Sequence, residues 1–218
     1  TPISDPDLSA EIKGIINMAS VKEFVPLEKG DEMSGVVKAD ISAAGRMSSI
    51  DKKEYDKFKM AGSLEIDKMN YKTTTLPYAV MLNMMKLNFT NQYVELAGFD
   101  ALMGKSDVRA NGKIDNFLQY IFKDSLIKGN FNVQSNFMDL NELMSSSTTE
   151  TAAAQPAAAD TAAMTVAEVP GNIDFNLNAN FVKVLYDNLT IDNMVGNIVV
   201  RQKKVDMTNL NLGLLGGK

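Results

Sequence analysis

Two stretches decide the fold: residues 38–46 read KADISAAGR, and residues 105–113 read KSDVRANGK. Lysine, aspartate, alanine and glycine recur at matching places 67 residues apart, and the same register continues without a gap until Gly62 meets Gly129. A run of matches at one constant offset indicates an internal repeat. We therefore expect the chain to be built from copies of one structural unit.

The content of this unit can be read from its hydrophobic pattern. Residues 37–43 alternate apolar and polar side chains, which is typical of a strand with one buried face. Segments 49–58 and 114–122 follow Gly45 and Gly112, and both place apolar residues at helical spacing over a length too short for an isolated helix. A second strand then begins at Gly62 or Gly129. The unit is predicted to be strand, short helix, strand.

Further strands are predicted outside the two copies. In residues 172–181, asparagine and aspartate alternate with large apolar side chains, and this is the clearest strand pattern in the chain. Other predicted strands cover residues 8–12, 85–90, 93–99, 198–201 and 205–214, with a short helix over 19–25. Polar turns at 91–92 and 202–204 have the lengths of hairpin connections. The predicted class is mainly β with short helices (α+β), the repeated units forming a twisted, curved antiparallel sheet or groove.

One segment, residues 144–170, interrupts the pattern because it consists mostly of alanine, threonine and serine. Such a segment has too little large apolar surface to offset the entropy lost on ordering, so we predict a flexible insertion. It separates a repetitive β-sheet segment, residues 1–143, from C-terminal strands in residues 171–218. These strands are expected to continue the same sheet system, although a second small domain remains an alternative.

The composition excludes several classes of function. Among the 218 residues there is no Cys and no His, so the usual zinc sites, the Ser-His-Asp triad and a Cys nucleophile are all absent. A net charge of −5 without a basic run argues against nucleic acid as a partner. Acidic residues are spread over polar strand positions and helix faces rather than paired, so we expect no enzyme, no metal site and no cofactor.

The remaining functional signal is the amount of strand with one apolar side. An apolar sheet face must be covered by helices, by a second sheet or by an apolar ligand, and the predicted helices are few and short. We predict an apolar lining that contacts acyl chains, formed by Leu64, Ile66, Phe131, Val133, Ile173, Phe175 and Leu177. The alternative is a closed scaffold or a protein-interaction module, with no lipid ligand, whose apolar face is simply its core.

Several short motifs resemble the AsmA family of Gram-negative bacteria, in particular its Bacteroidetes-type members. The likeness rests on SGVVKAD (34–40), GRMS (45–48), AGSL (61–64), MNY (69–71), GKIDNFL (112–118), FMDLN (137–141), KVLY (183–186) and LLGG (214–217). It covers most of the chain outside residues 145–170, but its motifs are diffuse repeat signatures and carry no catalytic residues.

The resemblance implies a periplasmic protein that is anchored in the inner membrane and forms a β-groove related to bridge-like lipid-transfer proteins. It also implies a role in lipid handling and outer-membrane biogenesis, with a phospholipid or another acyl-chain lipid as partner. The chain begins Thr1-Pro2 without an initiator methionine, contains no apolar run of membrane-spanning length, and lacks the expected anchor. We therefore expect it to be a segment of a longer protein that reaches the membrane through a part not included here.

Overall fold

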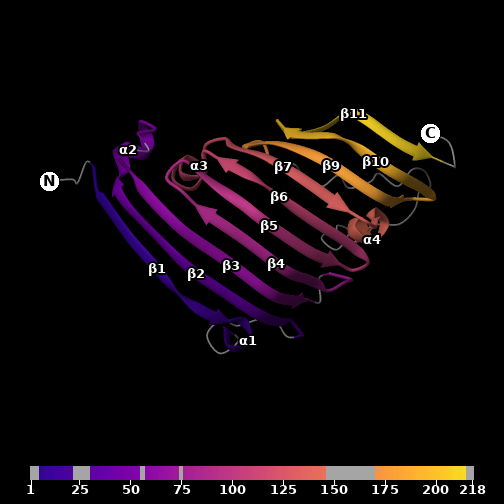
Figure 1. The fold of residues 1–218 in the computed structure, drawn as a ribbon, viewed down its shortest axis with the longest axis horizontal. Helices are drawn as coiled ribbons and strands as arrows, with labels where there is room; N and C mark the ends of the chain where they lie inside the picture. The colour runs from indigo at the N-terminus through magenta and orange to yellow at the C-terminus, as the bar shows by residue number, and fades with distance from the viewer. Residues whose placement is uncertain (1–4, 22–29, 55–56, 74–75, 146–169, 215–218) are drawn as a thin grey trace, which may run out of the picture.

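The computed structural model describes residues 5–21, 30–54, 57–73, 76–145 and 170–214, and these residues form one open, curved, eleven-stranded sheet (Figure 1). The predicted class, mainly β with short helices, is confirmed. The strands are β1 (Asp7–Asn17), β2 (Glu32–Arg46), β3 (Lys59–Lys72), β4 (Val80–Phe89), β5 (Tyr93–Met103), β6 (Ser106–Asp115), β7 (Ile127–Ser135), β8 (Met138–Asp139), β9 (Ile173–Tyr186), β10 (Leu189–Arg201) and β11 (Lys204–Leu214). The helices are α1 (Met18–Val21), α2 (Met47–Asp51), α3 (Phe117–Lys123) and α4 (Leu140–Ser145).

Strand order follows chain order from β1 to β11, except that the short β8 lies off this path and pairs with β9. Each main pair is antiparallel apart from β7 and β9, which run parallel from Ile127–Ile173 to Ser135–Phe181. The sheet is thus mostly antiparallel, as predicted, with this pair as an exception. A parallel pair requires a long crossover, and residues 136–172, which contain β8, α4 and the Ala/Thr/Ser-rich segment, supply its length. Residues 146–169, on which the predicted flexible insertion falls, lie outside the described residues.

This pairing also joins the C-terminal strands to the rest of the sheet. Because β9 bonds to β7 along its length, residues 173–214 extend the sheet formed by the first 135 residues. The antiparallel hairpins bring alternate connections to one end of the strands. We call the end that carries α2, α3 and the β10–β11 turn the α2/α3 rim, and the opposite end, which carries α4, the α4 rim (Figure 1).

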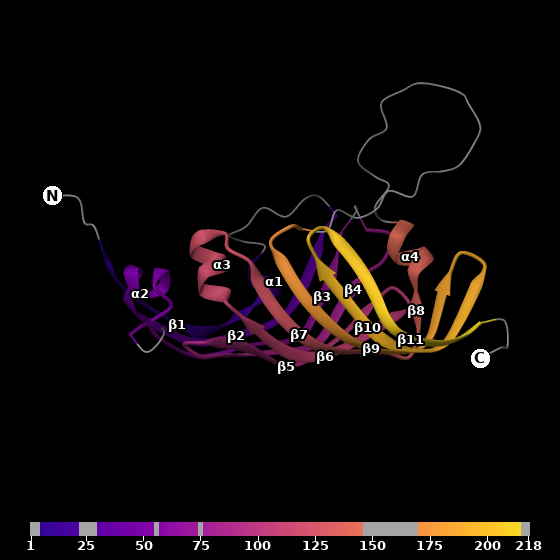
Figure 2. The same cartoon turned by 90° about the horizontal axis from the view of Figure 1, so that it is seen from above.

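The sheet is bent into a trough, with α2, α3 and α4 on its inner side (Figure 2). β-bulges increase local twist and bend the strand that contains them. Register irregularities of this kind interrupt β3, β4, β5, β10 and β11. Lys68, Asn193 and Asn209 have positive φ angles of 48°, 53° and 53° within their strands. The bulges thus account for part of the curvature that separates a concave from a convex face.

Two units repeat within the sheet, as the sequence predicts: β2–α2–β3 and β6–α3–β7. Their helices meet on the concave side, where Gln119 Nε2 donates a hydrogen bond of 3.1 Å to the backbone oxygen of Ile50. Both helices are shorter than the sequence pattern predicts. α3 begins only at Phe117, because Ile114 and Asp115 still pair with β5. α2 ends at Asp51, although the apolar spacing continues to Phe58.

Candidate functional site

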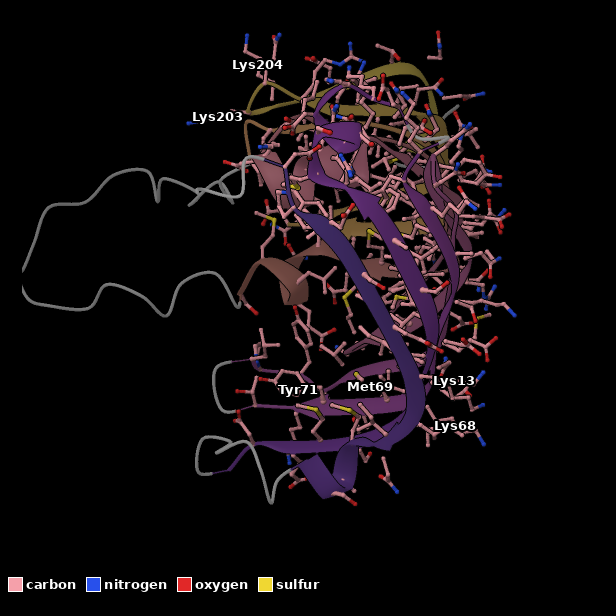
Figure 3. The ribbon with its side chains drawn as sticks, turned by 90° about the vertical axis from the view of Figure 1, so that its left-hand side faces the viewer. Lys13, Lys68, Met69, Tyr71, Lys203 and Lys204 are labelled. Carbon is pink, nitrogen blue, oxygen red and sulfur yellow. The ribbon has the colours of Figure 1, made fainter. Side chains whose placement is uncertain are left out.

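The concave face is a continuous apolar surface that crosses the sheet, and we call it the apolar face. Antiparallel register brings the apolar positions of neighbouring strands into rows. One row consists of Ala39, Leu64, Leu87, Leu96, Gly112, Phe131, Leu177, Ile198 and Met207. Figure 3 shows the two sides on one edge of the sheet: Met69 and Tyr71 point into the trough, whereas Lys13 and Lys68 point outward.

All seven residues predicted to line the site lie on the apolar face and are half-buried. Leu64 and Ile66 come from β3, two from β7 and three from β9. The structure brings the β7 and β9 residues together across the parallel pair, as Phe131 next to Leu177 and Val133 next to Ala179. Three strands separate the two β3 residues from β7, so the seven form two groups on one surface rather than a single pocket.

An aromatic pair marks the middle of the apolar face. The rings of Phe131 and Phe175 pack edge to face, with centroids 5.4 Å apart, a favourable geometry for aromatic contacts. Glycine lies beneath them: a Cβ on Gly112 would meet the backbone oxygen of Asn130 and the Phe131 ring, and a Cβ on Gly129 would meet both rings. Gly112 and Gly129 are therefore positions where an aromatic side chain packs directly over the backbone of the sheet.

The helices cover the apolar face only in part. At the α2/α3 rim, a cluster formed by Ile50, Phe58, Val94, Phe117 and Leu118 is almost fully buried against the ends of the strands. A second cluster, near the α4 rim, contains Ala179, Phe181, Val184 and Met194 and packs against β8 and α4. Between these clusters most side chains of β3 to β7 on this face, such as Leu64, Phe99 and Phe131, have an intermediate exposure, so no helix of the described residues lies over the middle of the apolar floor.

The second cluster borders a pocket of about 480 Å³ that sequence reasoning missed. Its walls come from β8, α4, β9, β10 and β11, and include Phe181, Val184, Met194, Ile198, Met207 and Leu212. The apolar residues Met207, Leu210 and Leu212 in the predicted last strand did indicate one wall of this pocket. The opposite wall comes from residues 138–140, and nothing local in the sequence places that segment beside β9 and β10.

The convex face is polar, and its side chains bond to one another across the strands. Ion pairs join Lys13 to Asp40 at 2.8 Å and Lys38 to Asp67 at 2.7 Å. A ladder of asparagine amides continues across β6, β7, β9, β10 and β11, through Asn111, Asn132, Asn178, Asn197 and Asn209, with bonds of 2.6–3.2 Å. These charged and amide side chains are exposed to solvent, as on most protein surfaces. The convex face is therefore polar, whereas the concave face is apolar.

The acidic residue Asp107 of the second repeat copy has a structural role. Asp107 accepts 2.8 Å hydrogen bonds from the backbone N–H groups of Asn136 and Phe137 and so fixes the turn after β7. Partial burial alone would raise the pKa of Asp107, but the hydrogen bonds from Phe137, Asn136 and Ser135 outweigh it and hold that pKa below its ordinary value. Asp187 and Asp206 lie at opposite ends of the strands. Among the described residues, no group of three or more acidic side chains is arranged to hold a metal ion.

Comparison with known proteins yields no match to a family model, to a curated protein or to a solved structure. Within the part of the chain that the structure describes, no helix has the length and hydrophobicity needed to cross a bilayer.

Proposed function

We propose that this chain is a non-enzymatic lipid-handling segment whose apolar face contacts the acyl chains of a phospholipid or a similar lipid. The observation that carries the proposal is the continuity of the apolar face: its rows run without a charged residue from β2 to β10, and the helices of the described residues cover them at two places. Apolar surface of this extent on a soluble protein usually marks a binding surface.

The lining suits hydrocarbon and offers little to a head group. Leu64, Ile66, Phe131, Phe175 and Leu177 present only carbon to the trough, so recognition there has no directional hydrogen bond. A lipid would lie with its acyl chains along the floor and its head group in solvent at the open side of the trough. From the resemblance of its motifs to the AsmA family, we also propose that the segment acts in the periplasm, in outer-membrane lipid homeostasis.

Lipid extraction tests the proposal. The protein is purified without detergent from cells with a complete envelope, and the extracted lipids are quantified by mass spectrometry. The variant Leu64→Asp/Phe131→Asp/Leu177→Asp, which places charge on three strands of the face, serves as comparison. Phospholipid bound to the wild-type protein and lost from the variant is expected. A wild-type protein that is folded and carries no more lipid than the variant refutes the proposal.

A second candidate, a protein-interaction module, is favoured by the two edge strands. Within the described sheet, β1 and β11 each leave one row of backbone N–H and C=O groups without a neighbouring strand, and Ile12, Ile15 and Ile16 on β1 are 53–73% exposed. An exposed edge of this length can pair with a strand from a partner. The substitution Lys13→Pro in β1 would weaken the pairing of this edge with a partner strand. It would leave lipid binding to the apolar face unchanged, so it separates the two functions.

A further inference from the structure

The pocket between α4 and β11 differs from the rest of the apolar face because it is enclosed on several sides. β8 and α4 form one wall, β9 and β10 form the floor, and β11 forms the other wall. Phe181, Val184 and Met194 on the floor are at most 7% exposed, so this part of the site is already packed and shaped. A hydrocarbon that entered would meet carbon and sulfur on several sides, rather than on one side as on the open floor of the trough.

The chemistry of its walls restricts the ligand. Every side chain around the pocket is aliphatic, methionine or aromatic, and none is charged. A volume of about 480 Å³ falls near the lower end of the range for small-molecule sites. The ligand that fits is one slender apolar chain, without a polar group at the buried end. Methionines at 138, 194 and 207 add flexible, polarisable side chains that adapt to such a chain.

The position of the pocket connects it with the trough. Ile198 lines the pocket and also stands in the row of the apolar face, next to Leu177 on one side and Met207 on the other. A chain lying along the floor therefore reaches the pocket without crossing a polar barrier. At the edge, Met207 and Leu210 are 54% and 44% exposed, as expected for side chains at an opening rather than in a core.

We propose that this pocket binds the methyl end of a single unbranched acyl chain and so forms a terminal site of the trough. The inference rests on the proposed lipid-handling function and adds to it a location, a stoichiometry of one chain and a selectivity for chain length over head group. Each added methylene that becomes buried tightens binding until the pocket is filled, whereas the head group remains in solvent and contributes little.

A photoreactive lipid tests the location. Dodecanoic acid with a diazirine at its methyl end is bound to the full chain, irradiated, and the labelled peptides are mapped by mass spectrometry. Labelling is expected on β8, β10 and β11. The variant Met207→Trp, which fills the opening from an exposed position, should lower this labelling about tenfold. Thr208→Trp, on the convex side of the same strand, is the matched control and should leave labelling unchanged.

Unlabelled competitors test the selectivity. Dodecanoate should displace the probe about tenfold more effectively than decanoate, because two more methylenes are buried, and dodecanol should match dodecanoate. Labels found only on β3 to β7, or labels on β10 and β11 that persist in Met207→Trp, overturn the terminal site while the proposed function stands. No labelling anywhere overturns both. Labelling that rises when residues 146–169 are deleted shows that the pocket is occupied by the chain itself, and this also overturns the inference.

Discussion

The open character of the apolar face can be tested at Phe175 by comparing two substitutions of almost equal size, Phe175→Asn and Phe175→Asp. Both remove the ring that packs on Phe131. Loss of the ring contact and of its buried area should destabilise either variant by about 3 kcal/mol. The informative quantity is the difference between the two variants, because it isolates the cost of placing a charge at this position.

The expected difference in stability between Phe175→Asp and Phe175→Asn depends on whether the apolar face is open or enclosed. A carboxylate on an open trough floor stays hydrated, so Asp and Asn should differ by less than about 1 kcal/mol at pH 7. In an enclosed core the carboxyl group would instead take up a proton. Raising its pKa from about 3.9 to 7 or above, at about 1.4 kcal/mol per unit, makes Asp less stable than Asn by about 4 kcal/mol.

Phe117 provides the internal control, because it lies in the cluster under α2 and α3 and is only 4% exposed. Phe117→Asp should be less stable than Phe117→Asn by several kcal/mol, or fail to fold. The free energy of unfolding is measured for lipid-free protein by urea titration with circular dichroism. A large Asp–Asn difference at Phe175, equal to that at Phe117, would show that the apolar face is a closed core and would refute the reasoning.

Three further changes have specific expected outcomes. Gly112→Ala should lower the free energy of unfolding by about 2 kcal/mol, roughly the cost of overpacking. Gly14→Ala is the control, because no atom lies within 4 Å of its new Cβ, and it should be neutral or slightly stabilising. Thermal denaturation distinguishes the two variants, and equal effects would contradict the packing described. Asp107→Asn should cost about 1–3 kcal/mol at pH 7. The pKa of Asp107 is lower in the folded state, so its contribution to stability is complete above about pH 4 and is lost as the pH falls through the folded-state pKa. Urea titrations should therefore find the stabilities of the variant and the wild type converging in acid. A stability difference that does not change with pH would contradict this role of Asp107. Gln119→Leu should cost about 0.5–1.5 kcal/mol by removing the 3.1 Å hydrogen bond to the backbone oxygen of Ile50, which keeps its bond from the Lys53 N–H, and hydrogen exchange should then accelerate in α2 and α3 but not in β9–β10.

The repeat and the strand alternation predicted much of this fold. The glycine register located β2–α2–β3 and β6–α3–β7, and the alternation in residues 172–181 located β9 on the correct phase. Strand lengths were less predictable, because bulges break the period of two. The strand predicted from Met85 in fact begins at Val80, beyond an irregularity between Leu82 and Met84. β10 likewise extends to Leu189, past the positive φ at Asn193.

The direction of each strand relative to its neighbours could not be predicted from local sequence patterns, because apolar and polar residues alternate in the same way in parallel and antiparallel pairs. The parallel pair β7–β9 depends on a long crossover, and the sequence does not show on which edge that crossover returns. The same crossover explains why the pocket was missed. Met138 and Leu140 face β9 and β10 only because β8 pairs in parallel with Val184 and Leu185. Sequence predicted the apolar face, and tertiary topology created its enclosed end.

Fluorescence quenching tests contact between the apolar face and lipid most directly, because the chain contains no tryptophan. Single tryptophans are introduced at Leu177, on the apolar face, and at Asn176, its neighbour on the convex face. Each protein is incubated with vesicles of phosphatidylcholine that carries brominated acyl chains, and is then separated from them. We expect bromine to quench Leu177→Trp and leave Asn176→Trp unaffected. Equal quenching at both positions, or none at either, would contradict the proposal that the concave face carries acyl chains.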